Sequence, residues 1–292
     1  MTIPESQLEI WSHPGAVTTA KATHESIRNA LNSYEWPGDV IYEVYLQGSY
    51  KNSTNIYGDS DVDIVVQLNS TFYSNLSEDE KRYLHIEPAS YVWRDFRDDV
   101  LSALRGYYDY SKIKEGDKCV KVESNGNRLH ADVVIAAQYR KYRSININDF
   151  VEGITFWTQL FRNKIINYPK QHYKNGVSKN SRTNSWYKPT VRIFKNIRTY
   201  LLKNGKIEED LAPSYFLECF IYNTDDENFG YKYTNTFLSV LNWLSESFSD
   251  DKFQDFLCQN EQNILFGVKE DCWSPRKAIQ LLKSIINLWQ NW

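Results

Sequence analysis

The sequence has 292 residues, of which 41% are hydrophobic and 24% charged, with only 12 glycines and 8 prolines. This composition excludes a disordered chain and a collagen-like repeat. A chain of this length forms one large domain or two packed lobes and buries a sizeable core without disulfides. The four cysteines lack the close pairing of a zinc ribbon, so we expect reduced, buried thiols. We find no apolar run of the roughly 20 residues that a membrane helix needs, and we expect a cytoplasmic protein.

The charges are distributed unevenly, although the net charge is only −3. Residues 162–206, the basic segment, contain twelve basic residues and no acidic one. Apolar and aromatic residues are interleaved with these charges, which argues against a bare charged tail. The segment therefore finds its counter-charge in the fold, in solvent or in an anionic ligand.

The first half of the chain predicts a mixed α/β fold. Strands are predicted from runs of β-branched and aromatic residues, and helices from apolar residues at helical spacing. In chain order the predicted elements are a helix over 16–34, strands over 41–47 and 62–68, a helix over 88–108, and strands over 118–123 and 129–137.

The second half predicts a helical lobe that follows a polar connection over residues 168–181. Four segments have helical periodicity, at 184–202, 213–222, 236–248 and 274–289. In the last of them Ser274 is the expected N-cap and Pro275 the first helical residue. Its expected buried face comprises Ile279, Leu282, Ile286 and Trp289. We therefore predict two domains, 1–168 with a long N-terminal helix and 169–292.

A glycine–serine pair follows the first predicted strand, and an acidic pair begins the second. At Gly48 the missing side chain allows a phosphate to approach the backbone N–H groups, and at Ser49 the hydroxyl adds a further hydrogen-bond donor. Asp61 and Asp63 are two residues apart on a strand, so both carboxylates point to the same face. Because the flanking residues are apolar, leaving this pair unneutralised is costly, which favours a hard cation such as Mg²⁺.

A third carboxylate, Asp132, lies in another apolar strand. Each part has a simpler explanation when taken alone: a common loop dipeptide, a solvated acidic pair, and an aspartate that caps a loop. Together, three carboxylates and substrate phosphates suit two metal ions, one at the attacking hydroxyl and one at the leaving oxygen. The pattern predicts nucleotidyl transfer, with Asp61, Asp63 and Asp132 as the catalytic and metal-binding residues.

The complete motif comprises Gly48-Ser49, Thr54, Ile56, Ser60-Asp61-Val62-Asp63 and, further along, Asp132. It resembles the signature of the DNA polymerase β-like nucleotidyltransferases, and among them the cGAS/DncV-like enzymes of bacterial anti-phage CBASS systems. The likeness extends over most of the chain, through residues 168–176 and 187–195 to 213–216. It implies an α+β fold in which a polymerase β-like palm, a mixed sheet with flanking helices, packs against a C-terminal helical lobe.

The same resemblance implies the activity, since the spacing alone supports only nucleotidyl transfer. Relatives of this kind use two Mg²⁺ ions, with Mn²⁺ as a substitute, and condense NTPs into a cyclic di- or trinucleotide. The product is a second messenger that acts on a downstream effector. We expect a monomer with no membrane association and no stable nucleic-acid partner.

Three basic residues on the helix predicted from residue 184 complete the candidate site. Lys188, Arg192 and Lys195 follow helical spacing and share one face. Taken alone they indicate a solvated helix face. Together with the carboxylates they predict binding of the triphosphate group of a nucleoside triphosphate. Tyr215, at the start of the next helix, is a candidate for stacking on a base, although an aromatic residue there is more often part of the core.

Two other functions stay open on the sequence. The chain could transfer nucleotides to RNA or protein, as tailing enzymes and some toxins or antitoxins do, with the basic segment along an RNA backbone. It could also be a catalytically silent nucleotide-binding protein. The negative net charge disfavours the first alternative, and the three carboxylates disfavour the second.

Overall fold

The computed structural model describes residues 2–15, 18–58, 61–126, 128–268 and 272–292. Its contacts divide the chain into two compact units. The sheet unit comprises residues 16–51 and 60–170, and the helical unit comprises residues 1–15, 52–59 and 171–292. None of the helices described is both long and apolar enough to cross a membrane. The predicted domain boundary after residue 168 stays a prediction.

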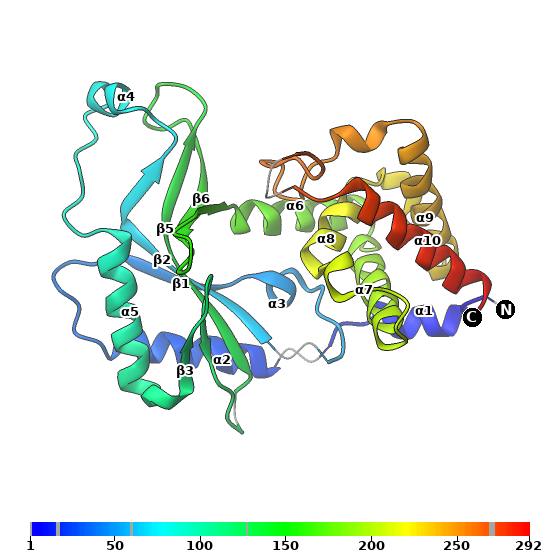
Figure 1. Ribbon diagram of the computed structural model, residues 1–292, viewed down its shortest axis with the longest axis horizontal. Coiled ribbons are helices and arrows are strands. Elements are labelled where there is room, and N and C mark those ends of the chain that lie inside the picture. The colour runs from blue at the N-terminus through cyan, green and yellow to red at the C-terminus, as the bar shows by residue number, and fades with distance from the viewer. Residues whose placement is uncertain (1, 16–17, 59–60, 127, 269–271) are drawn as a thin grey trace. The chain divides into compact units, whose positions relative to one another are not determined.

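A seven-stranded mixed sheet forms the centre of the sheet unit (Figure 1). Its strands are β1 (Tyr42–Leu46), β2 (Asp61–Ser74), β3 (Ile113–Glu115), β4 (Val120–Val122), β5 (His130–Tyr142), β6 (Phe150–Trp157) and β7 (Lys164–Asn167). The strand order is β1-β2-β5-β4-β3, and β6 pairs with both β5 and β7. Strands β2 and β5 run parallel, while the other pairings between these strands are antiparallel.

Helices α2 (Thr18–Asn32) and α5 (Trp93–Tyr108) pack on each other and against β1, β2 and β5. Both helices are amphipathic, so each buries one apolar stripe. The core that they form with the sheet includes the fully buried side chains of Ile27, Leu31, Val62, Ile64, Phe96 and Val100. Two shorter helices, α3 (Gly48–Asn52) and α4 (Glu78–Tyr83), follow β1 and β2.

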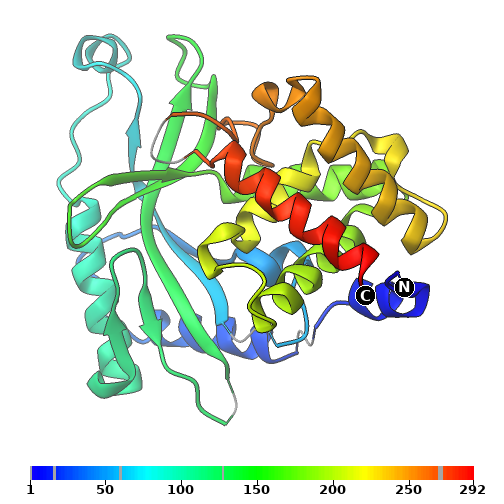
Figure 2. The same cartoon turned by 45° about the vertical axis from the view of Figure 1, so that its right-hand side comes forward.

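The helical unit is built around one buried helix, α7 (Tyr187–Lys203). Helix α7 contacts α1 (Glu5–Ser12), α8 (Ser214–Tyr222), α9 (Tyr233–Ser249) and α10 (Pro275–Gln290), as Figure 2 illustrates. The carboxylate of Glu5 accepts hydrogen bonds from the N–H groups of Tyr233 and Thr234, both at 2.8 Å, and so caps the start of α9.

The helix predicted over residues 16–34 is confirmed as α2. Helix α2 ends at Asn32, and a separate helix, α1, precedes it. Residues 16–17 of the predicted helix lie outside the described residues. Pro14 separates the two helices, because a proline lacks the N–H of a helix interior and disfavours helical backbone at the residue before it.

The predicted polar connection over residues 168–181 is wrong, because this segment forms helix α6 (Pro169–Arg182). The buried residues of α6 are His172, Gly176 and Lys179, which follow helical spacing but include no hydrophobic side chain. A search for apolar periodicity therefore misses the helix.

Other corrections are smaller. Helix α5 begins at Trp93 instead of residue 88, and the hairpin formed by β6 and β7 was not predicted. Pro275 is the first residue of α10 as expected, but the side chain of Ser274 makes no capping hydrogen bond there. The fully buried residues of α10 are Ala278, Leu281, Leu282 and Ile285. Of the predicted face, Leu282 is buried, Ile286 and Trp289 are partly buried against the same core, and Ile279 is exposed. The four cysteines are thiols, of which Cys219 and Cys258 are buried and Cys119 and Cys272 half-buried.

Candidate functional site

The three predicted carboxylates lie on β2 and β5, the parallel pair within the sheet. In the register of this pair Asp63 is opposite Asp132, and Asp61 is opposite His130. Register partners and alternate residues of one strand share a face, so all three carboxylates are on the same face of the sheet. Neighbouring strands are about 4.8 Å apart, which leaves Asp63 and Asp132 within reach of one bridging ion.

Gly48 brings the chain directly against the Asp63 carboxylate. Its backbone is in the left-handed region, with φ +63°, and a β-carbon at this position would lie 2.1 Å from Oδ2 of Asp63. The backbone N–H of Gln47 also donates to the carbonyl of Asp63 at 2.9 Å. Gly48 and Ser49 therefore begin α3 immediately beside Asp63. Ser60 of the same motif lies outside the described residues.

Cys119 lies close to two of the carboxylates. Burial, followed by the negative charge of Asp132 and a smaller effect of Asp63, raises the pKa of the Cys119 thiol to about 12. Lys121, which is opposite Asp132 in the β4–β5 register, has its Nζ 3.9 Å from Oδ1 of Asp132. Neither neighbour was identified from the sequence.

Three carboxylates with a shared orientation have the ligand chemistry of a hard divalent cation, which prefers oxygen donors. The absence of a β-carbon at Gly48 leaves room for the Asp63 carboxylate itself. In the part of the chain that the structure describes, no three acidic, histidine or cysteine side chains are already gathered around one metal position. The strands place the carboxylates on one face of the sheet. Their role as metal ligands stays a prediction.

Two of the predicted phosphate-binding cations have backbone carbonyls as partners. Arg192 donates from Nε to the carbonyl of Ser12 and from Nη1 to that of Ser53. Lys195 donates from Nζ to the carbonyl of Thr54 at 2.9 Å. Both side chains are buried, and burial lowers the pKa of Arg192 to about 10. Their contact with a triphosphate stays a prediction.

The other two candidates are more accessible. Lys188 is half-buried, with its Nζ 5.9 Å from the ring centre of Tyr173. Burial, followed by the charge of Arg192, lowers the pKa of Lys188. Tyr215 is 44% exposed, and its ring stacks on that of His172 with a centroid distance of 5.1 Å. Their roles in nucleotide binding also stay predictions.

Sequence reasoning missed Glu218, a buried carboxylate on α8 that bonds to Asn52, Thr54 and His172. A signal was present, since Glu218 is the single charged residue of a strongly apolar helix. A charge in that setting is buried only where polar partners compensate it.

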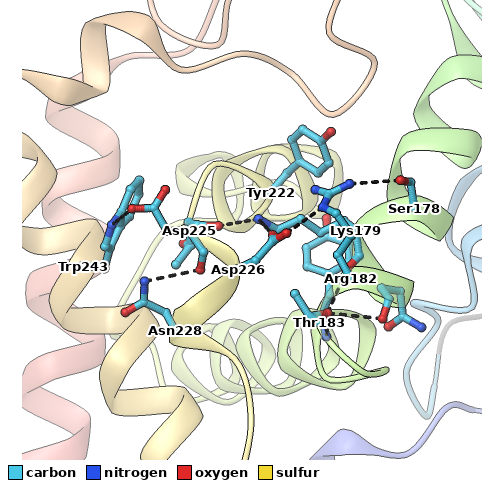
Figure 3. Close-up of polar contacts among 12 residues, drawn as sticks. Ser178, Lys179, Arg182, Thr183, Tyr222, Asp225, Asp226, Asn228 and Trp243 are labelled. Atoms are coloured by element: carbon cyan, nitrogen blue, oxygen red, sulfur yellow. Dashed lines mark hydrogen bonds and ion pairs between the residues drawn. The ribbon is translucent and has the colours of Figure 1, made fainter.

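Part of the basic segment finds its counter-charge within the fold. Asp226 binds Lys179 through Oδ1 at 2.8 Å and Arg182 through Oδ2 at 2.6 Å, as Figure 3 shows. In the sheet unit Lys170 pairs with the carboxylates of Glu43 and Glu152. These ion pairs reduce the positive charge that the segment offers to a nucleic-acid backbone.

Two family models match the chain. Residues 25–154 match the nucleotidyltransferase domain, and residues 174–290 match the cGAS/DncV-like nucleotidyltransferase C-terminal helical domain.

Relatives match over the full length. The chain is 52% identical to a cyclic UMP-AMP synthase of Rhodothermus marinus, with 100% of this chain and 99% of that protein covered. It is 40% identical to a cyclic nucleotide synthase of Staphylococcus haemolyticus, with both chains fully covered. The solved Rhodothermus marinus c-UMP-AMP synthase superposes with a TM-score of 0.93, covering 99% of this chain and 97% of the other. A cyclic dinucleotide synthase of Elizabethkingia meningoseptica, 28% identical, superposes with a TM-score of 0.81 and 98% coverage of each chain.

The fold, together with the Gly-Ser turn beside three strand-borne carboxylates, defines a nucleotidyltransferase. The chain belongs to the cGAS/DncV-like nucleotidyltransferases. These matches confirm the predicted family, fold class and enzyme class, in which nucleoside triphosphates are condensed into cyclic nucleotides. Nucleotidyltransferases of this superfamily typically use divalent metal ions, and nucleoside triphosphates fit as substrates.

Proposed function

We propose that this chain condenses two nucleoside triphosphates into a cyclic dinucleotide at the carboxylates of Asp61, Asp63 and Asp132. The observation that carries the proposal is the register of the parallel strands, which sets Asp63 opposite Asp132 with Gly48 against Asp63. These carboxylates would hold two Mg²⁺ ions, or Mn²⁺ in their place. When bound, such ions supply neutralisation of phosphate charge and a lowered pKa of the attacking hydroxyl.

The reaction consists of two displacements of the same kind. A ribose hydroxyl of one nucleotide attacks the α-phosphorus of the second, a phosphodiester P–O bond forms, and the bond to the β-phosphate breaks with release of pyrophosphate. A hydroxyl of the linear product then attacks the remaining α-phosphorus, the bond to its β-phosphate breaks, and the ring closes with release of a second pyrophosphate. The chain contributes orientation: the sheet holds the carboxylates on one face, and the turn at Gly48 and Ser49 offers N–H and hydroxyl donors to the phosphates.

We further propose that the two bases are uracil and adenine. The support is the Rhodothermus marinus cyclic UMP-AMP synthase, with 52% identity over the whole chain. Relatives at 31–32% identity include a cyclic dipyrimidine and a cyclic dipurine synthase, so base choice differs within the family. The product would reach a downstream effector in anti-phage defence. The chain would act as a monomer in the cytoplasm, where its cysteines stay reduced.

Radiolabelled nucleotides test the proposal. The purified protein is incubated with each pair of NTPs, one labelled at the α-phosphate, with Mg²⁺, in the presence and absence of RNA. A phosphatase-resistant product that contains one UMP and one AMP supports it. Elongated RNA or labelled protein would support macromolecular transfer, and unchanged NTPs would support a silent nucleotide-binding protein.

Two substitutions test the residues. Asp63→Asn and Asp132→Asn keep the size of the side chain but remove one negative charge. Because bound metal contributes several kcal/mol, turnover is expected to fall by at least about 10³-fold in either variant. The control is Asp39→Asn, an exposed carboxylate of the sheet unit, which is expected to leave turnover unchanged. Wild-type turnover in Asp63→Asn or Asp132→Asn would contradict the assignment.

A further inference from the structure

A buried carboxylate in the helical unit holds the segment that links the two halves of the motif. Glu218 is 4% exposed and lies on α8 among apolar side chains. Its Oε1 accepts a hydrogen bond from Oγ1 of Thr54 at 2.6 Å. Its Oε2 accepts from Nδ2 of Asn52 and faces Nε2 of His172, both at 3.0 Å. Three polar side chains therefore converge on one buried carboxylate.

These partners keep the carboxylate ionised. Burial alone would raise the pKa of Glu218. The hydrogen bond and charge of His172 outweigh burial, with help from Lys195 and Thr54, and lower the pKa to about 2. An ionised carboxylate only accepts hydrogen bonds, so Nε2 of His172 carries the proton. Among the described residues Nδ1 of His172 has no hydrogen-bond partner.

The same segment is held from a second helix. On α7, Lys195 donates to the carbonyl of Thr54, and Arg192 donates to that of Ser53. Ser53 has φ +57°, a left-handed conformation that a residue with a β-carbon adopts only at a cost. Asn52 and Thr54 are themselves buried. Helices α7 and α8 therefore both hold this segment, and α6 contributes only through the contact of His172 with Glu218.

In the sequence this segment lies between the Gly-Ser pair and the acidic pair of the motif. Asn52 is the last residue of α3, which begins at Gly48, and so lies about one helical turn beyond the Gly-Ser pair. The segment leads along the chain to β2, which begins at Asp61. The segment is therefore next in the chain to both halves of the motif.

We propose that Glu218 is a positioning residue for nucleotidyl transfer, which fixes the linking segment through Asn52 and Thr54. The inference rests on the proposed function. Glu218 touches no reacting group, and acts by keeping the Gly-Ser turn and the acidic pair in their productive arrangement. Misplacing reacting groups by about 1 Å costs about 10²-fold in rate. A looser segment is therefore expected to lower kcat more than it raises KM.

The first test is Glu218→Gln, which keeps the side-chain size but removes the charge and one acceptor. Expected is a 10- to 100-fold lower kcat, with the KM for NTPs changed less than about threefold. Thr54→Val is expected to lower kcat in the same direction, and Thr54→Ser, which retains the hydroxyl donor, is expected to restore it. If Glu218→Gln does not fold, the comparison of Thr54→Val with Thr54→Ser provides the test.

The matched control is Asp226→Asn, which removes a carboxylate that binds Lys179 and Arg182 in the same helical unit. It is expected to lower the melting temperature without lowering kcat, because Asp226 makes none of the contacts to residues 52–54 described above. A kcat of Glu218→Gln within about twofold of that of Asp226→Asn, at equal folded fraction, would overturn the proposal.

Hydrogen exchange gives a readout that needs no turnover. The amides of residues 52–56 are expected to exchange at least tenfold faster in Glu218→Gln than in wild type, and at the wild-type rate in Asp226→Asn. Equal exchange in all three proteins would refute the anchoring itself. A wild-type protein without turnover would instead contradict the proposed function, and exchange would still decide whether Glu218 orders the segment.

Discussion

Gly48→Ala tests the close approach between the turn and the Asp63 carboxylate. The left-handed backbone at Gly48 costs a residue with a β-carbon about 1–2 kcal/mol. The new β-carbon would also lie 2.1 Å from Oδ2 of Asp63, whereas ordinary contact begins at 3.4 Å. Either the carboxylate or the start of α3 must therefore move by about 1 Å, a displacement that costs about 10²-fold in rate. The assay is the initial rate of cyclic dinucleotide formation at saturating NTP and Mg²⁺, with thermal unfolding measured in parallel.

Gly38→Ala separates the two effects. Gly38 is also left-handed, with φ +78°, but a β-carbon there would meet nothing within 4 Å. This variant is expected to lose a similar 1–2 kcal/mol of stability and to keep kcat within about twofold of wild type. If both glycine variants have the same kcat, the contact between Gly48 and Asp63 is unimportant for the reaction and the reasoning is refuted.

Two further predictions concern the buried charges of the helical unit. Because the folded-state pKa of Glu218 is about 2 and its ordinary value 4.5, its ionisation stabilises the fold above pH 4.5 and this contribution is lost as the pH falls toward 2. This ionisation contributes roughly 3 kcal/mol to the unfolding free energy at pH 7. In urea titrations, the difference in unfolding free energy between wild type and Glu218→Gln is therefore expected to fall by more than half between pH 7 and pH 3. A difference that does not depend on pH would contradict this prediction. Lys195→Met removes the donor to the Thr54 carbonyl and is expected to lower the unfolding free energy by about 2–3 kcal/mol. The control is Lys188→Met, at a half-buried position of the same helix, which is expected to lower the unfolding free energy by less than about 1 kcal/mol. Unchanged stability together with a raised KM in Lys195→Met would instead favour the triphosphate grip predicted from the sequence.

The candidate catalytic positions were predictable because their signals are local. Two-residue alternation places Asp61 and Asp63 on one face wherever that strand pairs, and a glycine beside them allows a backbone conformation that other residues avoid. The pairing of Asp63 with Asp132 is different in kind. It depends on the parallel register of β2 and β5, two strands that are far apart in the sequence.

Helix α6 shows where local signals fail. Its buried residues, His172, Gly176 and Lys179, keep helical spacing, yet none is a hydrophobic side chain. They are buried because partners from other segments compensate them, such as Glu218 for His172 and Asp226 for Lys179. Apolar periodicity predicts a helix only where burial is achieved with apolar side chains.

The sequence by itself determined the alternating sheet pattern, the acidic motif and the shared helical face of Arg192 and Lys195. Only the tertiary structure decided what that face contacts. Both cations donate to backbone carbonyls of residues 12 and 53–54. Every residue carries the same carbonyl group, so no pattern of side chains marks such a partner, and folding alone selects which carbonyl a buried cation meets.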